Sequence, residues 1–237
     1  MDSIFGQFRT FYSKLVELGI AVEEITDVKD LTYENLRRYD AIAILDPGAW
    51  EFTESGENIV RTSSIPYTDE QLEAYRIYWE KGGHLFISGG DNTSLDIANT
   101  NRLLSIFNVS INYDKIPATT IVRNGVANAV QVENINRSHF VGERVETFDY
   151  NGASLNVSDD ATILAYEVFQ WSDDYGVIHT ALKPVLIAIE GRLSARVVIT
   201  CTNFFLDNWG LNNKYGATDD WKLLHGCIFW IMSIFQS

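Results

Sequence analysis

The chain has 237 residues, with 18 Lys and Arg against 32 Asp and Glu, which gives a formal net charge of −14. This surplus of negative charge repels phosphate backbones and anionic bilayers, so nucleic acid is excluded as an expected partner. The length and the apolar content of 46% indicate one folded domain rather than a disordered chain. We therefore expect residues 1–237 to form a single domain, in three stretches: 1–117, 118–182 and 183–237.

No segment has the pattern of a membrane-targeting or membrane-spanning sequence. The first residues lack a basic region followed by an apolar core, so no signal peptide is expected. The longest nearly apolar run, residues 227–235, is too short to cross a bilayer. Cys201 and Cys227 lie in apolar runs, which favours buried free thiols, although a disulfide between them stays open.

The first half of the chain alternates helical and strand patterns. Apolar spacing, caps and glycine stops predict helices at residues 5–19, 33–39, 69–81 and 99–107. Apolar runs predict strands at residues 20–25, 41–45, 84–87 and 109–113, the second of them covered on both faces. Residues 49–66 lack periodicity and are expected to form a long surface loop. This order indicates parallel strands joined by helical crossovers.

The second half of the chain has mainly strand patterns. After residue 118 helical periodicity fades, and short β-prone runs occur at residues 119–122, 145–148, 153–157 and 161–168. A loop at 171–176 precedes strands at 185–189 and 195–200, and Thr218 or Asp219 is placed to cap a final apolar helix. The predicted fold is α/β: a doubly wound, mostly parallel, flavodoxin-like sheet with an antiparallel β extension.

The most informative stretch is the strand-to-loop-to-helix junction at residues 80–94. Such junctions line the crevice beyond the carboxyl ends of parallel strands, where ligands bind. Ser88 lies at the end of the strand, where a nucleophile would stand, and the next two residues are glycines. The spaced Gly-x-Ser-x-Gly elbow is absent, however, and no sequence signature marks any histidine as the base that a hydroxyl needs. The four histidines are His84, His139, His179 and His225.

Three aspartates, Asp46, Asp91 and Asp207, each follow a strand-like run. Parallel strands would bring them to one sheet edge, where Asn92 and Asn203 could help them hold a hard cation. We favour the alternative, in which each aspartate caps a turn, because no spaced Asp-x-Asp-x-Asp-Gly loop is present. We therefore expect no metal and no cofactor. The candidate ligand-binding residues are Asp46, Ser88, Gly89, Gly90, Asp91, Asn92, Asn203 and Asp207.

Aromatic side chains in predicted loops offer a contact surface for a protein partner. It is equally plausible from the sequence that these aromatic side chains cover the hydrophobic core. The residues are Trp50, Phe52, Trp171, Tyr175, Trp209 and Tyr215. Asn-x-Ser sequences beginning at residues 92, 108, 136 and 156 favour an extracellular or lumenal location only slightly over a cytoplasmic one.

Several blocks resemble class I glutamine-amidotransferase-like domains. They are Leu-Thr-x-Glu-x-Leu at 31–36, Tyr-Asp-Ala-Ile-Ala-Ile-Leu-Asp-Pro at 39–47, Tyr-Thr-x-Glu-x-Leu at 67–72 and Gly-Gly-His-Leu-Phe-Ile-Ser at 82–88. Later blocks lie at 99–111, 138–142, 151–155 and 195–208. More narrowly, the chain is similar to the GIFT branch, found in an intraflagellar transport protein and in bacterial gliding or ABC-transport-associated proteins. It also resembles the domain that follows the catalytic domain of site-1-type subtilisin-like proteases.

The resemblance implies the fold without the glutaminase machinery. In true amidotransferases the elbow residue is a cysteine served by a histidine and a glutamate near the end of the domain. Here Ser88 stands at the matching position, the tail has no His-x-Glu pair, and Phe140 replaces the proline expected after His139. The expected function is thus a non-catalytic binding or assembly module with a protein partner, as in an accessory to a subtilisin-like protease.

Two further expectations follow from the resemblance and the crevice. A serine hydrolase that uses Ser88, with the amides of Gly89 and Gly90 as oxyanion donors, is the alternative to a binding module. Relatives also place a strand before the first helix, which this sequence does not show. We expect that the strand is missing from the fold or that the sequence is the C-terminal part of a larger protein.

Overall fold

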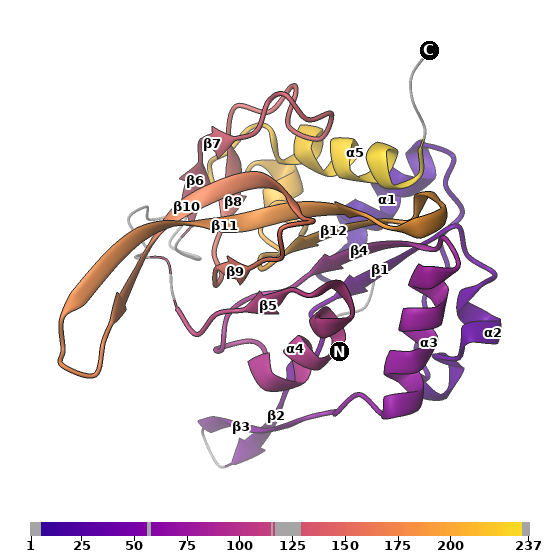
Figure 1. Ribbon diagram of the computed structural model, residues 1–237, viewed down its shortest axis with the longest axis horizontal. Helices are drawn as coiled ribbons and strands as arrows, with labels where there is room; N and C mark the ends of the chain where they lie inside the picture. Colours follow the sequence, from indigo (N-terminus) through magenta and orange to yellow (C-terminus); the bar gives the residue numbers. More distant parts are fainter. Residues whose placement is uncertain (1–5, 56–57, 115, 117–128, 234–237) are drawn as a thin grey trace.

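The computed structural model describes residues 6–55, 58–114, 116 and 129–233. Its main feature is a six-stranded sheet with the order β1-β4-β12-β11-β10-β7 (Figure 1). In that order the strands are Ala41–Leu45, His84–Ser88, Arg196–Thr200, Ile178–Glu190, Thr162–Ser172 and Asn134–Ile135. The α-helices are α1 (Arg9–Glu17), α2 (Tyr33–Leu36), α3 (Asp69–Glu80), α4 (Ile97–Leu104) and α5 (Asp220–Ile231).

Three small two-stranded sheets and short 3₁₀ turns complete the described structure. The small sheets pair β2 (Trp50–Ser55) with β3 (Asn58–Ser64), β5 (Ser110–Ile111) with β9 (Leu155–Asn156), and β6 (Val130–Val132) with β8 (Phe148–Tyr150). The 3₁₀ turns are η1 (Val28–Asp30), η2 (Ser105–Phe107), η4 (Arg192–Ser194) and η5 (Gly210–Asn212).

The main sheet is mixed: the predicted antiparallel extension is present, but the prediction that the sheet is mostly parallel is wrong. β1, β4 and β12 run parallel to one another, whereas β12/β11, β11/β10 and β10/β7 are antiparallel pairs. The physical reason is the hairpin between β10 and β11: two strands joined by a tight turn pair antiparallel and need no crossover helix. The boundary at residues 182 and 183 falls inside β11.

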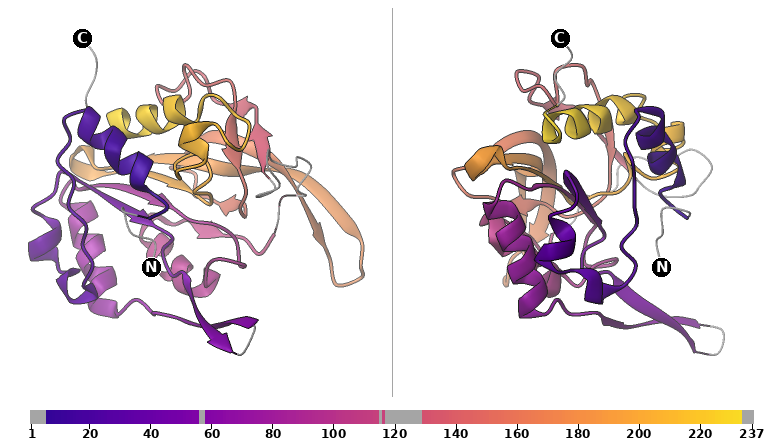
Figure 2. Two further views of the ribbon diagram at one scale, coloured as in Figure 1. Left: turned by 180° about the vertical axis from the view of Figure 1, so that it is seen from behind. Right: turned by 90° about the vertical axis from the view of Figure 1, so that its right-hand side faces the viewer.

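The sheet is the middle layer of an α/β arrangement. α1 and α5 cover one face and α3 and α4 the other, with α2 packed against α3 (Figures 1 and 2). β4, β12 and the second half of β11 are almost continuously buried, which explains their unbroken apolar sequences. None of the helices in the described residues is both long enough and apolar enough to span a membrane.

Helix boundaries follow local signals closely. Thr68 and Gln71 form the capping box at the start of α3: Thr68 Oγ1 accepts from the Gln71 N–H at 3.2 Å, and Gln71 Oε1 accepts from the Thr68 N–H at 3.0 Å. Asp219 precedes α5 but does not cap it, because its carboxylate accepts from the Glu146 N–H at 2.8 Å and pairs with Lys222. Cys201 and Cys227 are buried free thiols.

Three local predictions are wrong. Residues 49–66 contain the β2/β3 hairpin, whose strands pair from Trp50 with Ser64 onward, rather than a loop. Residues 20–25 form no strand. β1 is only half-buried, because it lies at the end of the sheet and has one neighbour, β4. The strand predicted at residues 119–122 lies outside the described residues.

Candidate functional site

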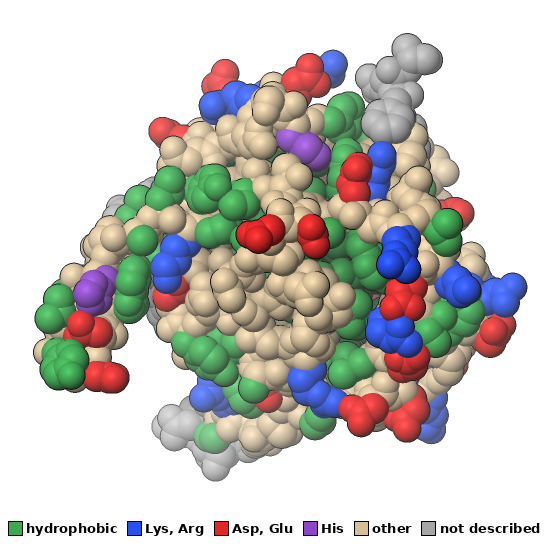
Figure 3. Space-filling model, viewed as in Figure 1, with side chains coloured by type: hydrophobic (Ala, Val, Ile, Leu, Met, Phe, Trp, Pro, Cys, Tyr) green, Lys and Arg blue, Asp and Glu red, His purple; other side chains and the backbone are tan. Residues whose placement is uncertain are grey.

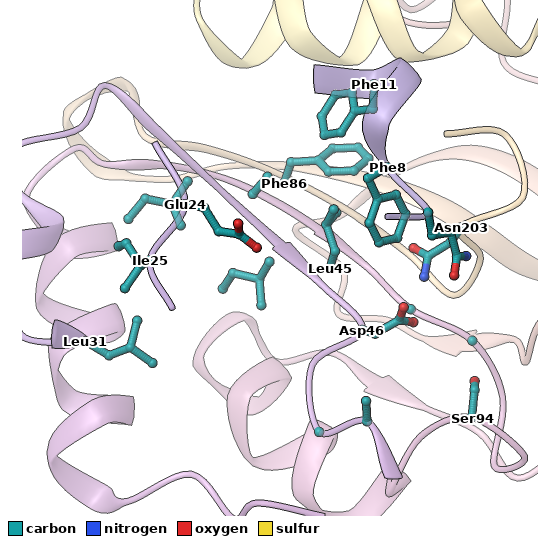
Figure 4. A pocket seen from close by; sticks show the side chains of 18 of the residues that line it. Phe8, Phe11, Glu24, Ile25, Leu31, Leu45, Asp46, Phe86, Ser94 and Asn203 are labelled. Atoms are coloured by element: carbon teal, nitrogen blue, oxygen red, sulfur yellow. The ribbon is translucent and has the colours of Figure 1, made fainter. Parts of the chain in front are cut away.

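A cavity of about 1420 Å³ runs along β1 and opens beside the carboxyl ends of β1 and β4 (Figure 4). Five of the eight predicted site residues line it: Asp46, Gly89, Gly90, Asp91 and Asn203. The parallel register explains why they meet, since Leu45 and Thr200 both lie beside Ser88. Residues that follow these strands therefore reach the same sheet edge.

Ser88 itself does not line the cavity. Its side chain is fully buried, and its Oγ donates a hydrogen bond of 2.6 Å to Oδ1 of Asn203. An amide oxygen accepts a hydrogen bond but is far too weak a base to remove the hydroxyl proton. The hydroxyl of Ser88 is therefore buried and hydrogen-bonded to an uncharged amide group.

All four histidines make their contacts elsewhere. Those contacts are His84 Nδ1 with the Arg196 N–H, His139 Nδ1 with the Val141 N–H, His179 Nε2 with the Asp173 carboxylate, and the His225 ring stacked on Phe229. Burial lowers the pKa of His84, His139 and His225 and so favours their neutral forms. Among the described contacts of Ser88, none comes from an imidazole.

The glycines and Asp46 let two loops cross closely at the sheet edge. Asp46 adopts a left-handed φ of 52°, while its N–H donates to the Ser88 carbonyl at 2.8 Å. A Cβ on Gly89 would lie 2.7 Å from Leu95 Cδ1, and one on Gly90 would lie 2.2 Å from Ser94 Oγ. Tight packing is thus one reason for glycine at both positions.

Asp91 accepts a hydrogen bond within its own loop, whereas Asn92 contacts the β2/β3 hairpin. Oδ1 of Asp91 accepts from the Thr93 N–H at 2.7 Å, which is the turn-capping role that the sequence favoured. The Asn92 carbonyl accepts from Trp50 Nε1 at 3.3 Å and from Arg61 Nη1 at 3.0 Å. Asn92 is not among the described residues that line the cavity.

Asp207 lies apart from the cavity, in a buried acidic cluster that sequence reasoning missed. Its Oδ1 accepts from the N–H groups of Trp209 and Gly210, both at 2.8 Å, and its Oδ2 accepts from the Tyr215 hydroxyl at 2.7 Å. Burial raises the pKa of the Asp207 carboxyl.

Asp149 and Asp220 complete this cluster. Oδ1 of Asp220 accepts from the Asp149 N–H at 2.8 Å, and the Asp149 carboxylate accepts from the Ala217 N–H at 3.0 Å. Burial raises the pKa of both carboxyls, that of Asp220 most strongly, and the negative charge of Asp149 raises the pKa of Asp220 further. The available signal was the Asp219–Asp220 pair before an apolar helix, in which the sequence pattern indicated a role only for Asp219, as a cap.

No arrangement of three or more His, Cys, Asp or Glu side chains suited to a metal ion occurs in the described residues. The carboxylates of the cluster instead accept hydrogen bonds from backbone N–H groups and from the Tyr215 hydroxyl. The cluster therefore ties β8 to the start of α5 and to the loop after β12.

Comparisons with known proteins place the fold. No family model and no curated protein matches the sequence. The N-terminal domain of mmIFT52 superposes with a TM-score of 0.68 at 16% identity, over 98% of this chain and 93% of that one. A cytoplasmic protein from Salmonella typhimurium gives 0.60 at 16% identity, covering 95% and 87%. A protein described as ThuA-like from Bacteroides uniformis gives 0.58 at 16% identity, covering 96% and 84%.

At these identities the similarity establishes the fold and nothing finer. The mmIFT52 and ThuA-like neighbours have amidotransferase-like folds, so the predicted resemblance is confirmed at that level. Membership of the GIFT branch stays a prediction.

Proposed function

We propose that this domain is a non-catalytic binding module that takes part in protein assembly. The observation that carries the proposal is the sealed contact between Ser88 and Asn203. A serine nucleophile needs access to substrate and a base that removes its proton, whereas Ser88 is buried and its hydroxyl donates to an amide oxygen in the described residues. The amidotransferase-like fold is then a scaffold whose surfaces, rather than an elbow nucleophile, carry the function.

The β10–β11 hairpin supports a role in assembly. It projects from the body as a long arm (Figure 1), and hydrophobic side chains lie along it (Figure 3). Tyr175 is 92% exposed at its tip and Ile178 is 71% exposed beside it. Large apolar side chains on a projecting element gain little for the folded chain, so contact with another protein is the use that fits them best.

The arm is organised before any partner arrives. Asp173 Oδ1 accepts from the N–H groups of Tyr175 and Val177, both at 2.9 Å, and so fixes the turn. The Trp171 ring stacks on His179 with 5.4 Å between centroids. A pre-formed surface loses less conformational entropy on binding than a disordered one.

A narrower role, as the accessory domain of a subtilisin-like protease, rests on the sequence resemblance, and no compared structure supports it. The rival activity is a serine hydrolase. It would require Asn203 to release the Ser88 hydroxyl and a base to take its place.

Hydrolysis of glutamine, simple esters and peptide amides tests the proposal. We expect no turnover above buffer from the wild type, from Ser88→Ala or from Ser94→Ala, a control that removes a hydroxyl lining the cavity beside Ser88. Ser88→Ala should still lower the free energy of unfolding by about 1–2 kcal/mol, because Oδ1 of Asn203 loses its donor. Turnover by the wild type and Ser94→Ala that disappears in Ser88→Ala would overturn the non-catalytic proposal.

A further inference from the structure

The outer edge of β1 presents backbone groups that no described residue pairs. Because the Asp46 N–H donates to Ser88, and successive N–H groups along a strand point to opposite sides, the N–H groups of Ala43 and Leu45 point away from β4. Their carbonyls point the same way, since in a parallel strand both groups of a residue face one side. An unpaired edge of this kind is a template for another strand.

Residues 20–25 form the facing wall. Each of them lines the cavity, as does every residue of β1. Their one backbone hydrogen bond among the described residues joins the Ile20 N–H to the Leu15 carbonyl at 3.0 Å. Figure 4 shows Glu24 and Ile25 on one side of the cavity and Leu45 and Asp46 on the other. Two stretches of chain with unpaired backbone thus flank one space.

The space suits a polypeptide better than a small molecule. Its volume of about 1420 Å³ exceeds the range of roughly 300–1,000 Å³ typical of small-molecule pockets. Apolar side chains from both helices on one face of the sheet line it, including Phe11 of α1, Phe8 just before α1, and Ile228 and Ile231 of α5. A strand placed there would bury apolar side chains and satisfy backbone groups at the same time.

The charged residues that line the cavity indicate which charge a binding partner should carry. The charged residues among the described lining are Glu23, Glu24, Asp46, Glu51 and Asp91, and no Lys, Arg or His accompanies them. A second copy of the chain, with a net charge of −14, would be repelled. Lys or Arg flanking an apolar segment would be attracted.

We infer that β1 accepts one β-strand from a separate protein: an extended segment with an apolar centre and Lys or Arg at its ends. The strand pairs with the outer edge of β1 and fills the cavity between β1 and residues 20–25. This inference rests on the proposed binding function and specifies the partner's chemistry.

A labelled peptide, Lys-Arg-Val-Ile-Ala-Val-Ile-Gly-Arg-Lys, tests the inference by fluorescence anisotropy with the 237-residue chain. We expect saturable binding that weakens as salt rises. A matched peptide with proline in place of alternate apolar residues should bind at least about tenfold more weakly, because it lacks the donors that β1 requires. On binding, the amides of Ala43 and Leu45 should gain protection from hydrogen exchange, whereas that of Ile44, which faces β4, changes little.

Two variants separate the edge from the charge. Ala43→Pro removes an outward-facing N–H that the β1–β4 pairing does not use, so binding should fall at least about tenfold while a cooperative thermal transition remains. Glu23→Gln with Glu24→Gln should weaken binding roughly threefold to tenfold at low salt. Asp159→Asn with Asp160→Asn removes the same charge outside the lining and should leave binding unchanged.

Several results would overturn the inference: no peptide binding, binding that both Ala43→Pro and the Glu23→Gln with Glu24→Gln variant leave unchanged, or protection of Ala43 and Leu45 without peptide. In the last case, concentration-dependent sedimentation would identify a second copy as the occupant. The same protection in a monomeric, longer natural form of the protein would instead identify a segment of its own chain. Turnover dependent on Ser88 would refute the non-catalytic proposal and leave the peptide result as it stands.

Discussion

The two ends of the central sheet satisfy their backbones in different ways. At one end, β10 and β11 pair along their length, from Thr162 opposite Ala188 to Ser172 opposite Ile178, because the chain reverses in a turn fixed by Asp173. At the other end, β1 pairs with one strand in the described part of the chain, β4, which the chain reaches only after the β2/β3 hairpin and α3. A hairpin pairs two strands that are adjacent in the sequence. Strands joined by crossovers pair only where the tertiary fold brings them side by side.

The largest difference should appear when buried side chains are truncated at each end. Leu186→Ala in β11 removes a fully buried side chain and should lower the free energy of unfolding by about 3 kcal/mol. Ile42→Ala in β1 removes a half-buried side chain that lines the cavity and should cost only about 1 kcal/mol. Urea denaturation of both variants measures the difference. Equal losses would show that the β1 end is as tightly packed as the hairpin end.

The acidic cluster offers a second comparison, because side chains rather than β pairing hold the chain there. In Asp220→Asn the side-chain oxygen can still accept the hydrogen bond from the Asp149 N–H. The amide NH₂ group replaces Oδ2, a buried oxygen that has no hydrogen-bond partner among the described residues. We expect the variant to be more stable than the wild type at pH 7 by about 1–3 kcal/mol.

This gain should depend on pH. Since the folded-state pKa of Asp220 is raised, the native protein holds its proton more tightly than the unfolded chain does, and wild-type stability falls as pH rises above the ordinary carboxyl value of 3.8. The gain from Asp220→Asn should therefore be small near pH 4 and grow toward pH 7. Thermal unfolding of both proteins across that range, with Asp160→Asn as an exposed control, measures it. A gain independent of pH would contradict the raised pKa of Asp220.

The smallest effect on stability should come from the projecting arm. Ile178→Ser removes an exposed apolar side chain that contributes little to the core, so the free energy of unfolding should change by less than about 0.5 kcal/mol. Association with a partner protein, measured by pull-down from a lysate of the source organism and then by titration, should nevertheless weaken. A large loss of stability would show that the arm packs within the domain instead.

Local signals predicted much of the fold. The capping box of Thr68 and Gln71 located α3, and apolar runs located β4 and β12, because caps and periodicity depend on neighbouring residues. The β2/β3 hairpin was missed because it lies outside the main sheet, in a segment of polar sequence where apolar alternation is weak. The mixed sheet was missed because strand order follows from which segments pair in space.

The candidate site also has features that the sequence predicted and features that depend on the tertiary structure. By itself the sequence determined that Asp46, Ser88 and Asn203 follow strands and belong at one sheet edge. Only the tertiary structure decided that Ser88 is buried against a residue 115 positions away, that burial beside Asp149 raises the pKa of Asp220, and that no described residue pairs with the outer edge of β1 beside residues 20–25. The physical reason is that burial, pKa shifts and unpaired edges arise from contacts between distant segments, whereas caps, glycine stops and apolar spacing are properties of adjacent residues.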